Sequence, residues 1–207
     1  MGLINLLFKD PLEFILIAIP LLYSIILHEL AHGWVAYQMG DPTAKTLGRL
    51  SLNPLRHLDP VGTLMLFIFG FGWAKPVPVN FNRLRDRHMG MILVSSAGII
   101  TNMVLAFSAL FLGRLLSPSP SSLLAVLLFY FAHINIILAA FNLIPLPPLD
   151  GSKILMGFAS PRVQDFLFRL ERYGFFIIIA FLYLGVLNPV IRFFRWLIMA
   201  FINLLLP

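Results

Sequence analysis

Long apolar runs, separated by short polar stretches, make up most of this chain. A helix needs about 20 consecutive apolar residues to cross the hydrocarbon core of a bilayer. Runs of this kind, the fourth of them shorter, predict transmembrane helices at 12–39, 89–116, 122–144, 174–187 and 190–206. The last two are separated by Asn188-Pro189, a pair that favours a break between helices. The pattern therefore predicts an all-α polytopic membrane protein with about five transmembrane helices.

The stretch between the first two predicted spans has a different character. Its apolar part, Val61–Trp73, is too short for a span, and it holds three glycines before a proline-rich run from Lys75 to Val79. Glycine and proline at this density disfavour a straight helix. We predict that residues 46–80 form a short membrane-associated region of β or re-entrant structure. The whole chain, 1–207, is expected to be one membrane-embedded domain.

The composition supports a membrane location. Of the 207 residues, 59% are hydrophobic and only 12% are charged, whereas soluble domains carry about a quarter charged residues. This excludes a soluble globular protein, a disordered chain and a nucleic-acid-binding domain, although the net charge of +6 alone would suggest nucleic acid. The chain has no cysteine, so any metal must be held by histidine and carboxylate.

The distribution of basic residues predicts the orientation. Seven lysines and arginines lie between the first two spans and four lie between the third and fourth, against only Lys9 before the first span and Arg114 near the second connection. Basic loops stay in the cytoplasm. We therefore expect a multi-pass protein of the cell membrane, with its N-terminus outside and its C-terminus inside. The segment Arg162–Tyr173 has apolar residues at helical spacing and is expected to lie on the cytoplasmic surface as an amphipathic helix.

Three ionisable groups interrupt the first apolar span, in the run His28-Glu29-Leu30-Ala31-His32. Such residues are costly inside a membrane and mark candidate functional sites. On a helix, His28 and His32 lie one turn apart on the same face, so both imidazoles can reach one cation while Glu29 lies beside it. The alternative is a set of hydrogen-bonded groups inside the bundle, for instance a proton path. A zinc site would need a third protein ligand.

Asp150 is the candidate for that third ligand. It follows the proline-rich run after Ile144, at the predicted cytoplasmic end of the third span. The orientation derived from the basic residues brings Asp150 and the two histidines to the same half of the bilayer, without any use of the histidine motif. The alternative is an ordinary helix end that is stopped by proline, with an aspartate in the turn.

Together these residues resemble the site-2 proteases, a family of intramembrane zinc metalloproteases, in a compact form without PDZ or CBS domains. The resemblance covers most of residues 20–155. It rests on His28-Glu29-Leu30-Ala31-His32, Gly40-Asp41-Pro42-Thr43-Ala44, Gly48-Arg49-Leu50-Ser51-Leu52-Asn53-Pro54, His57-Leu58-Asp59-Pro60-Val61-Gly62, Gly72-Trp73-Ala74-Lys75-Pro76-Val77-Pro78-Val79-Asn80, Asn142-Leu143-Ile144-Pro145 and Leu149-Asp150-Gly151. It implies a catalytic core of three helices, with membrane-associated strands between the first two.

The resemblance also implies roles for individual residues. His28, His32 and Asp150 would bind one zinc ion per chain, and Glu29 would be the catalytic carboxylate. Asn142 matches a position expected to hold the substrate backbone. Asn102 has the family's place in the second helix, where substrate contact competes with ordinary hydrogen bonding between helices.

One departure from the family pattern is Ser96-Ala97-Gly98-Ile99, where relatives often have proline after the glycine. This departure is expected to be neutral for activity, because it touches no predicted ligand.

The activity implied by the resemblance is hydrolysis of peptide bonds in or near transmembrane segments of other proteins, that is, regulated intramembrane proteolysis. The active site would face the cytoplasm. The expected partners are transmembrane proteins or peptides and the lipid bilayer, without nucleic acid, and a homo-oligomer is one possible assembly. The alternative is a metal-ion or proton transporter that uses the same histidine and carboxylate cluster. A transporter would more often spread such groups over several helices and show internal repeats.

Overall fold

All regular secondary structure in residues 3–70 and 72–207, the part that the computed structural model describes, is helical. Met1, Gly2 and Phe71 lie outside the described residues, so the predictions for the first two residues and for one position of Val61–Trp73 are not addressed. The α-helices are α1 (Leu3–Lys9), α2 (Pro11–Gln38), α3 (Thr43–Thr46), α4 (Pro60–Phe69), α5 (Arg87–Leu116), α6 (Leu123–Asn142), α7 (Asp150–Phe158), α8 (Pro161–Tyr183) and α9 (Leu187–Leu205). Two short 3-10 helices are η1 (Pro54–Arg56) and η2 (Phe81–Arg83).

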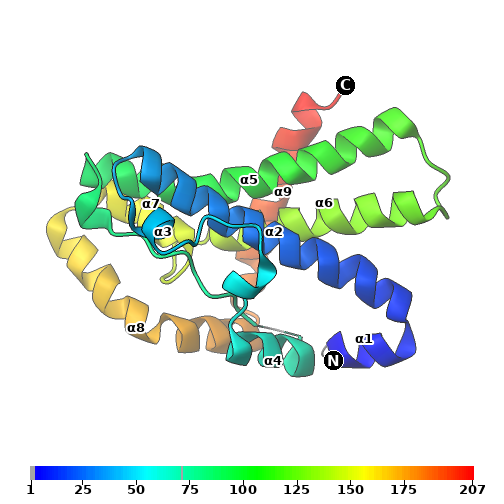
Figure 1. Ribbon diagram of the computed structural model, residues 1–207, viewed down its shortest axis with the longest axis horizontal. Coiled ribbons are helices and arrows are strands. Elements are labelled where there is room, and N and C mark those ends of the chain that lie inside the picture. The colour runs from blue at the N-terminus through cyan, green and yellow to red at the C-terminus, as the bar shows by residue number, and fades with distance from the viewer. Residues whose placement is uncertain (1–2, 71) are drawn as a thin grey trace.

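Helices α2, α5 and α6 run side by side along the long axis of the molecule, with α5 packed against both of the others (Figure 1). They correspond to the predicted spans at 12–39, 89–116 and 122–144, which are confirmed as helices. Small buried residues such as Ala106 and Ala139 line their contacts and let the helices approach closely. The three helices are also joined by polar side chains in their buried core, which are described below.

The prediction for Val61–Trp73 was wrong over most of its length, because Pro60–Phe69 forms helix α4. The capping residues explain this. Asp59 Oδ1 accepts a hydrogen bond of 2.7 Å from Gly62 N at the start of the helix, and Gly70 ends it in the left-handed conformation with φ 73°. Gly70 is thus a stop signal rather than a helix breaker. No strand is found in the described part of 46–80, where the isolated bridge Leu58–Ala74 is the only pairing of that kind.

The number of membrane-crossing helices also differs from the prediction. Four helices of the described chain, α2, α5, α6 and α9, are long and apolar enough to cross a membrane. The predicted span at 174–187 instead continues the amphipathic segment Arg162–Tyr173 as the single helix α8. Helix α9 begins at Leu187, before the expected break, because Pro189 lies in its first turn, where proline is tolerated.

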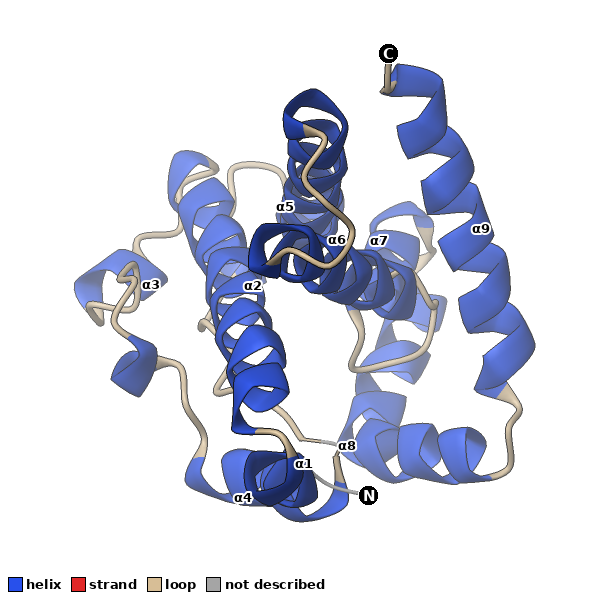
Figure 2. Ribbon diagram, turned by 90° about the vertical axis from the view of Figure 1, so that its right-hand side faces the viewer, coloured by secondary structure: helices blue, strands red, loops and turns tan. Residues whose placement is uncertain are grey.

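Helix α9 runs across the three core helices rather than alongside them (Figures 1 and 2). Its C-terminal end lies beside the end of α5, where an Arg114 side-chain nitrogen donates a hydrogen bond of 2.6 Å to Pro207 O. The basic-residue pattern placed Arg114 outside and the C-terminus inside. These two assignments cannot both hold while this contact joins the two groups.

Candidate metal centre

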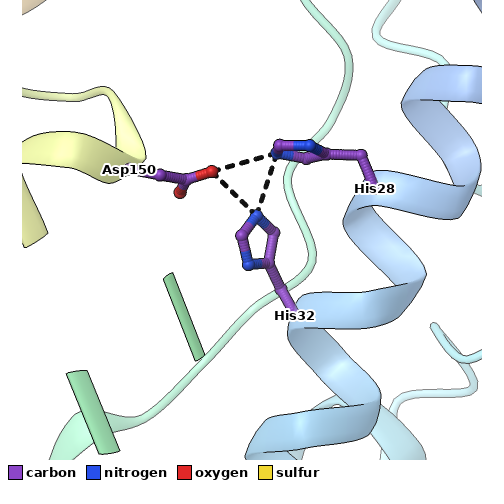
Figure 3. A group of neighbouring side chains, drawn as sticks. All are labelled: His28, His32 and Asp150. Carbon is purple, nitrogen blue, oxygen red and sulfur yellow. Dashed lines mark hydrogen bonds and ion pairs between the residues drawn. The ribbon is translucent and has the colours of Figure 1, made fainter. Parts of the chain in front are cut away.

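Three potential ligand atoms converge between α2 and the first residue of α7 (Figure 3). The Nε2 atoms of His28 and His32 lie 3.0 Å apart, and Asp150 Oδ2 lies 3.0 Å from the first and 3.1 Å from the second. All three residues are buried, with exposures of 7–8%. The structure therefore brings together the three residues that the sequence singled out as ligands, although Asp150 is more than 100 positions from the two histidines in the chain.

The hydrogen bonds of the two imidazoles show which nitrogen faces the cluster. Asn102 Nδ2 donates to Asn135 Oδ1 at 2.7 Å, so Asn102 Oδ1 is an acceptor, and His28 Nδ1 donates to it at 2.5 Å. His32 Nδ1 donates to Val94 O at 2.7 Å. In a neutral imidazole, the other nitrogen is then an acceptor. Both Nε2 atoms therefore present lone pairs to each other and to a carboxylate.

This arrangement fits a zinc ion. Three acceptor atoms facing one another repel unless a proton or a cation lies between them. Imidazole nitrogen and carboxylate oxygen are zinc ligands, and a tetrahedral ion with bonds of about 2.0–2.1 Å holds its ligands roughly 3.3 Å apart. The separations of 3.0–3.1 Å in the structure are close to that value. The Nδ1 atom of each histidine donates a hydrogen bond to another residue, and such a bond is typical of histidines that bind a metal through Nε2.

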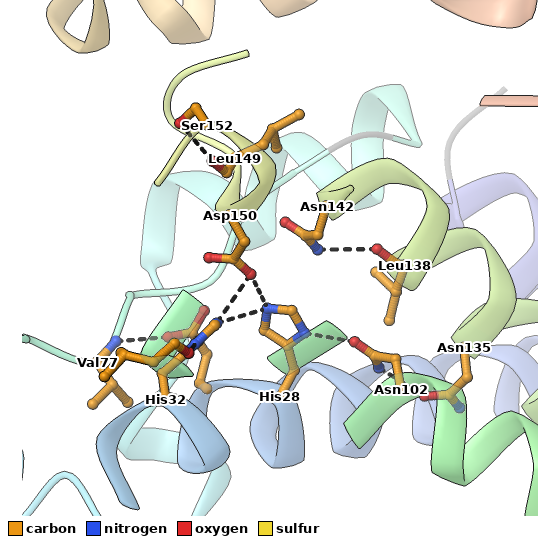
Figure 4. A network of polar contacts seen from close by, with 12 residues as sticks. His28, His32, Val77, Asn102, Asn135, Leu138, Asn142, Leu149, Asp150 and Ser152 are labelled. Atoms are coloured by element: carbon orange, nitrogen blue, oxygen red, sulfur yellow. Dashed lines mark hydrogen bonds and ion pairs between the residues drawn. The ribbon is translucent and has the colours of Figure 1, made fainter. Parts of the chain in front are cut away.

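A chain of buried polar groups behind His28 connects all three core helices (Figure 4). It runs from His28 to Asn102 on α5, then to Asn135 on α6, whose Nδ2 donates to Ser24 Oγ on α2 at 2.8 Å. Asn102 and Asn135 are fully buried. The structure thus places Asn102 in contact with a candidate ligand, and Asn102 is not among the residues that line the cavity described below.

Gly98 lies on the part of α5 that packs against the two imidazoles. A Cβ atom added at Gly98 would lie 2.5 Å from His28 Cε1, 2.6 Å from His28 Nε2 and 2.6 Å from His32 Nε2. These distances are too short for real contacts, so the histidine pair fits against α5 only because residue 98 has no side chain. The interpretation of Ser96-Ala97-Gly98-Ile99 as a segment that touches no ligand was therefore wrong.

Glu29 is half-buried and lies next to the histidines on α2. Its Oε2 accepts a hydrogen bond of 2.7 Å from the backbone N–H of Val77 (Figure 4). A second contact ties the same segment to the end of α2, because buried Asp41 Oδ2 accepts from Asn80 N at 2.6 Å. The sequence predicted neither contact, because no motif near residues 77–80 indicates that this segment packs against α2 and the turn after it.

The turn between α6 and α7 positions Asp150. A Cβ atom at Gly151 would collide with the carbonyl oxygens of Leu143 and Ile144, so glycine is needed where the chain folds back toward α6. Asp150 then begins α7 with its side chain toward the histidines.

A cavity of about 410 Å³ opens beside the three candidate ligands. Besides them, its lining includes Glu29, Val77, Ser95, Asn142, Lys153 and Glu171. Asn142, the last residue of α6, donates from Nδ2 to Leu138 O at 3.0 Å. The cavity is large enough to admit several atoms of a peptide to the immediate surroundings of Glu29 and the ligand cluster.

Comparisons with known proteins indicate the family of the chain. A model of peptidase family M50 matches residues 117–185. "Putative zinc metalloprotease YwhC" of Bacillus subtilis (strain 168) is 41% identical over 171 residues, covering 79% of this chain and 78% of that protein. "Putative zinc metalloprotease Rip2" of Mycolicibacterium smegmatis is 30% identical over 183 residues, covering 84% and 69%. "Putative zinc metalloprotease MJ0611" of Methanocaldococcus jannaschii is 34% identical over 146 residues, covering 70% and 71%. No solved structure matches the chain.

The chain belongs to peptidase family M50, which confirms the resemblance to the site-2 proteases. Membership supports a zinc metalloprotease, and the apolar helices support a multi-pass membrane protein. The transporter alternative is not favoured by any of these similarities.

Proposed function

We propose that this chain is an intramembrane zinc metalloprotease of the site-2 type, which hydrolyses peptide bonds in or near transmembrane segments of other membrane proteins. The observation that carries the proposal is the convergence of His28, His32 and Asp150, with unprotonated Nε2 atoms facing a carboxylate, beside Glu29 and an open cavity. This arrangement supplies both a metal site and a nearby base. A binding or transport site would not need the base.

His28, His32 and Asp150 would hold one zinc ion per chain. When bound, zinc lowers the pKa of a water ligand and polarises the carbonyl of the peptide bond to be cut. Glu29 acts as the general base that removes the proton of the attacking water, and then as the acid that delivers it to the leaving amine. The hydrogen bond from Val77 N fixes Glu29 Oε2. The described part of the chain supplies no hydrogen bond to Oε1, so this oxygen can carry that proton.

Asn142 is proposed to hold the backbone of the substrate. Its side chain belongs to the cavity lining at the end of α6. Its Nδ2 donates to Leu138 O, and among residues 3–70 and 72–207 no hydrogen bond to its amide oxygen is found. The amide oxygen is therefore available to accept a hydrogen bond from a substrate N–H. A substrate helix must unwind locally at this point, because its own N–H groups are otherwise bonded four residues back.

The proposed class of substrate follows from the apolar helices that surround the cavity. The cavity lies between apolar helices that can cross a membrane, so its natural ligand is an apolar transmembrane segment. We further propose that the active site faces the cytoplasm, as the basic residues between α2 and α5 favour. Proteolysis at this place would release a membrane-tethered domain, which is the chemical basis of a regulatory role.

The test is Glu29→Gln, with Glu13→Gln on the same helix as the matched control. Glu29→Gln should lower cleavage of transmembrane peptides by about 1,000-fold or more while zinc stays near one per chain, because only the base is lost. Glu13→Gln should cleave as the wild type does. Cleavage by purified Glu29→Gln protein would contradict the proposed roles. Metal transport that survives in Glu29→Gln, without any cleavage by the wild type, would instead favour the transporter.

A further inference from the structure

Ser95 lies in the wall of the same cavity, on α5. It directly follows Val94, whose carbonyl oxygen accepts the hydrogen bond from His32. It is only 1% exposed. Its hydroxyl oxygen is buried, and no hydrogen-bond partner for it exists among residues 3–70 and 72–207. A buried hydroxyl without a partner costs free energy, and native proteins rarely keep one without a reason.

A helical serine ordinarily meets this need within its own helix. Its hydroxyl donates to the carbonyl oxygen four residues earlier. Ser108, three turns or more further along α5, does so with Val104 O at 2.8 Å. Ser95 makes no such bond in the described chain, although the residue belongs to the lining of the cavity, so its hydroxyl does not serve the helix. A purely structural role does not explain this placement.

The other polar groups of the cavity show which hydrogen bonds a bound peptide would lack. Hydrogen-bond acceptors are plentiful, since the lining contains the carboxylates of Glu29, Asp150 and Glu171. Several donors are already used: Val77 N–H is bound to Glu29, and Nδ1–H of His32 is bound to Val94 O. Pro76 and Pro148, also in the lining, have no N–H group. An unwound peptide could therefore place its N–H groups readily, while donors for its carbonyl oxygens are fewer and include the Lys153 ammonium and the second N–H of Asn142 Nδ2.

We infer that Ser95 binds the substrate main chain, with its hydroxyl donating a hydrogen bond to a carbonyl oxygen of the unwound segment beside the cleavage site. This inference rests on the proposed protease function and adds a residue to that same site. The bond replaces one that the carbonyl loses when the substrate helix unwinds. It also gives the Ser95 hydroxyl the partner that it lacks in the free protein.

The experiment compares Ser95→Ala with Ser108→Ala, each combined with Glu29→Gln to prevent cleavage. The probes are fluorescent peptides of about 20 residues, each a single transmembrane segment, and the one that the wild type cleaves fastest is used for binding. The Ser95→Ala form should bind this peptide about 10-fold more weakly than the Ser108→Ala form. Ser95→Thr, which restores a hydroxyl, should recover most of the binding. Zinc content should be equal in all forms.

A second measurement separates substrate binding from a structural role. In the absence of peptide, Ser95→Ala should melt at the same temperature as the wild type or higher, because an unsatisfied buried group has been removed. A lower melting temperature for Ser95→Ala, or unchanged peptide binding, would overturn the inference. Suppose that the wild type cleaves the peptide, and that Glu29→Gln and the double variant Glu29→Gln/Ser95→Ala bind it with equal affinity. Then only the role of Ser95 is wrong, and the protease proposal stands. If the wild type cleaves no peptide of the set, the protease proposal fails and the inference fails with it.

Discussion

His28 Nδ1 lies 2.5 Å from Asn102 Oδ1, and this hydrogen bond joins a candidate zinc ligand on α2 to the middle of α5. Asn102 is itself fixed by Asn135 on α6. The orientation of the His28 ring, and with it the nitrogen that faces Asp150, is therefore determined by helices that hold no ligand of their own. The core of the bundle and the metal centre are in this sense one hydrogen-bonded structure.

Replacing Asn102 with alanine should weaken zinc binding by about 10- to 100-fold, because the His28 ring loses the acceptor that orients it. Zinc affinity can be measured by competition with a chromophoric chelator. Asn203→Ala, at an exposed position on α9, is the matched control and should leave zinc affinity unchanged. Equal zinc affinity in the Asn102→Ala and wild-type proteins would show that Asn102 does not position the ligand.

Gly98→Ala should abolish tight zinc binding, because the new methyl group would occupy the space of both imidazoles. The same helix offers a strict control in Gly113, where an added Cβ atom meets nothing within 4 Å. Gly113→Ala should keep one zinc per chain and gain up to about 1 kcal/mol in the free energy of unfolding, as expected for glycine to alanine in a helix. Metal analysis and thermal unfolding of the two purified variants test both statements. Normal zinc content in Gly98→Ala would refute the tight fit at this position.

Val77→Pro should lower the turnover number about 10-fold relative to Val77→Ala, because only the proline removes the N–H that holds Glu29 Oε2. Val77→Ala keeps that N–H and accounts for the loss of the valine side chain, which packs near Gly33. Zinc content should be the same in both variants, since neither change touches a ligand. Equal turnover numbers would mean that this hydrogen bond does not contribute to the action of Glu29.

The candidate site could be predicted from sequence because its signals are local. His28, Glu29 and His32 are fixed by helical spacing, and Asp150 stands out as a carboxylate after a proline-rich turn in an apolar chain. Gly98 could not be recognised in the same way. Its importance depends on how closely α5 approaches α2, which is a property of the packed bundle.

The errors in the fold have equally specific causes. The density of glycine and proline suggested an irregular segment after Val61, but Asp59 and Gly70 are caps that enclose a helix. Asn188-Pro189 suggested a break, although proline is accommodated in the first turn of α9. The contact of Arg114 with Pro207 depends on the path of α9 across the bundle, which no count of basic residues contains.

The most direct test of the central claim is a zinc titration of the purified wild-type protein after complete chelation. The chelated protein should cleave no transmembrane peptide, and activity should rise in proportion to added zinc and reach its plateau at one zinc per chain. This is expected because His28, His32 and Asp150 form a single three-ligand centre. Full cleavage by the chelated protein, or a plateau that requires two zinc ions per chain, would contradict the account.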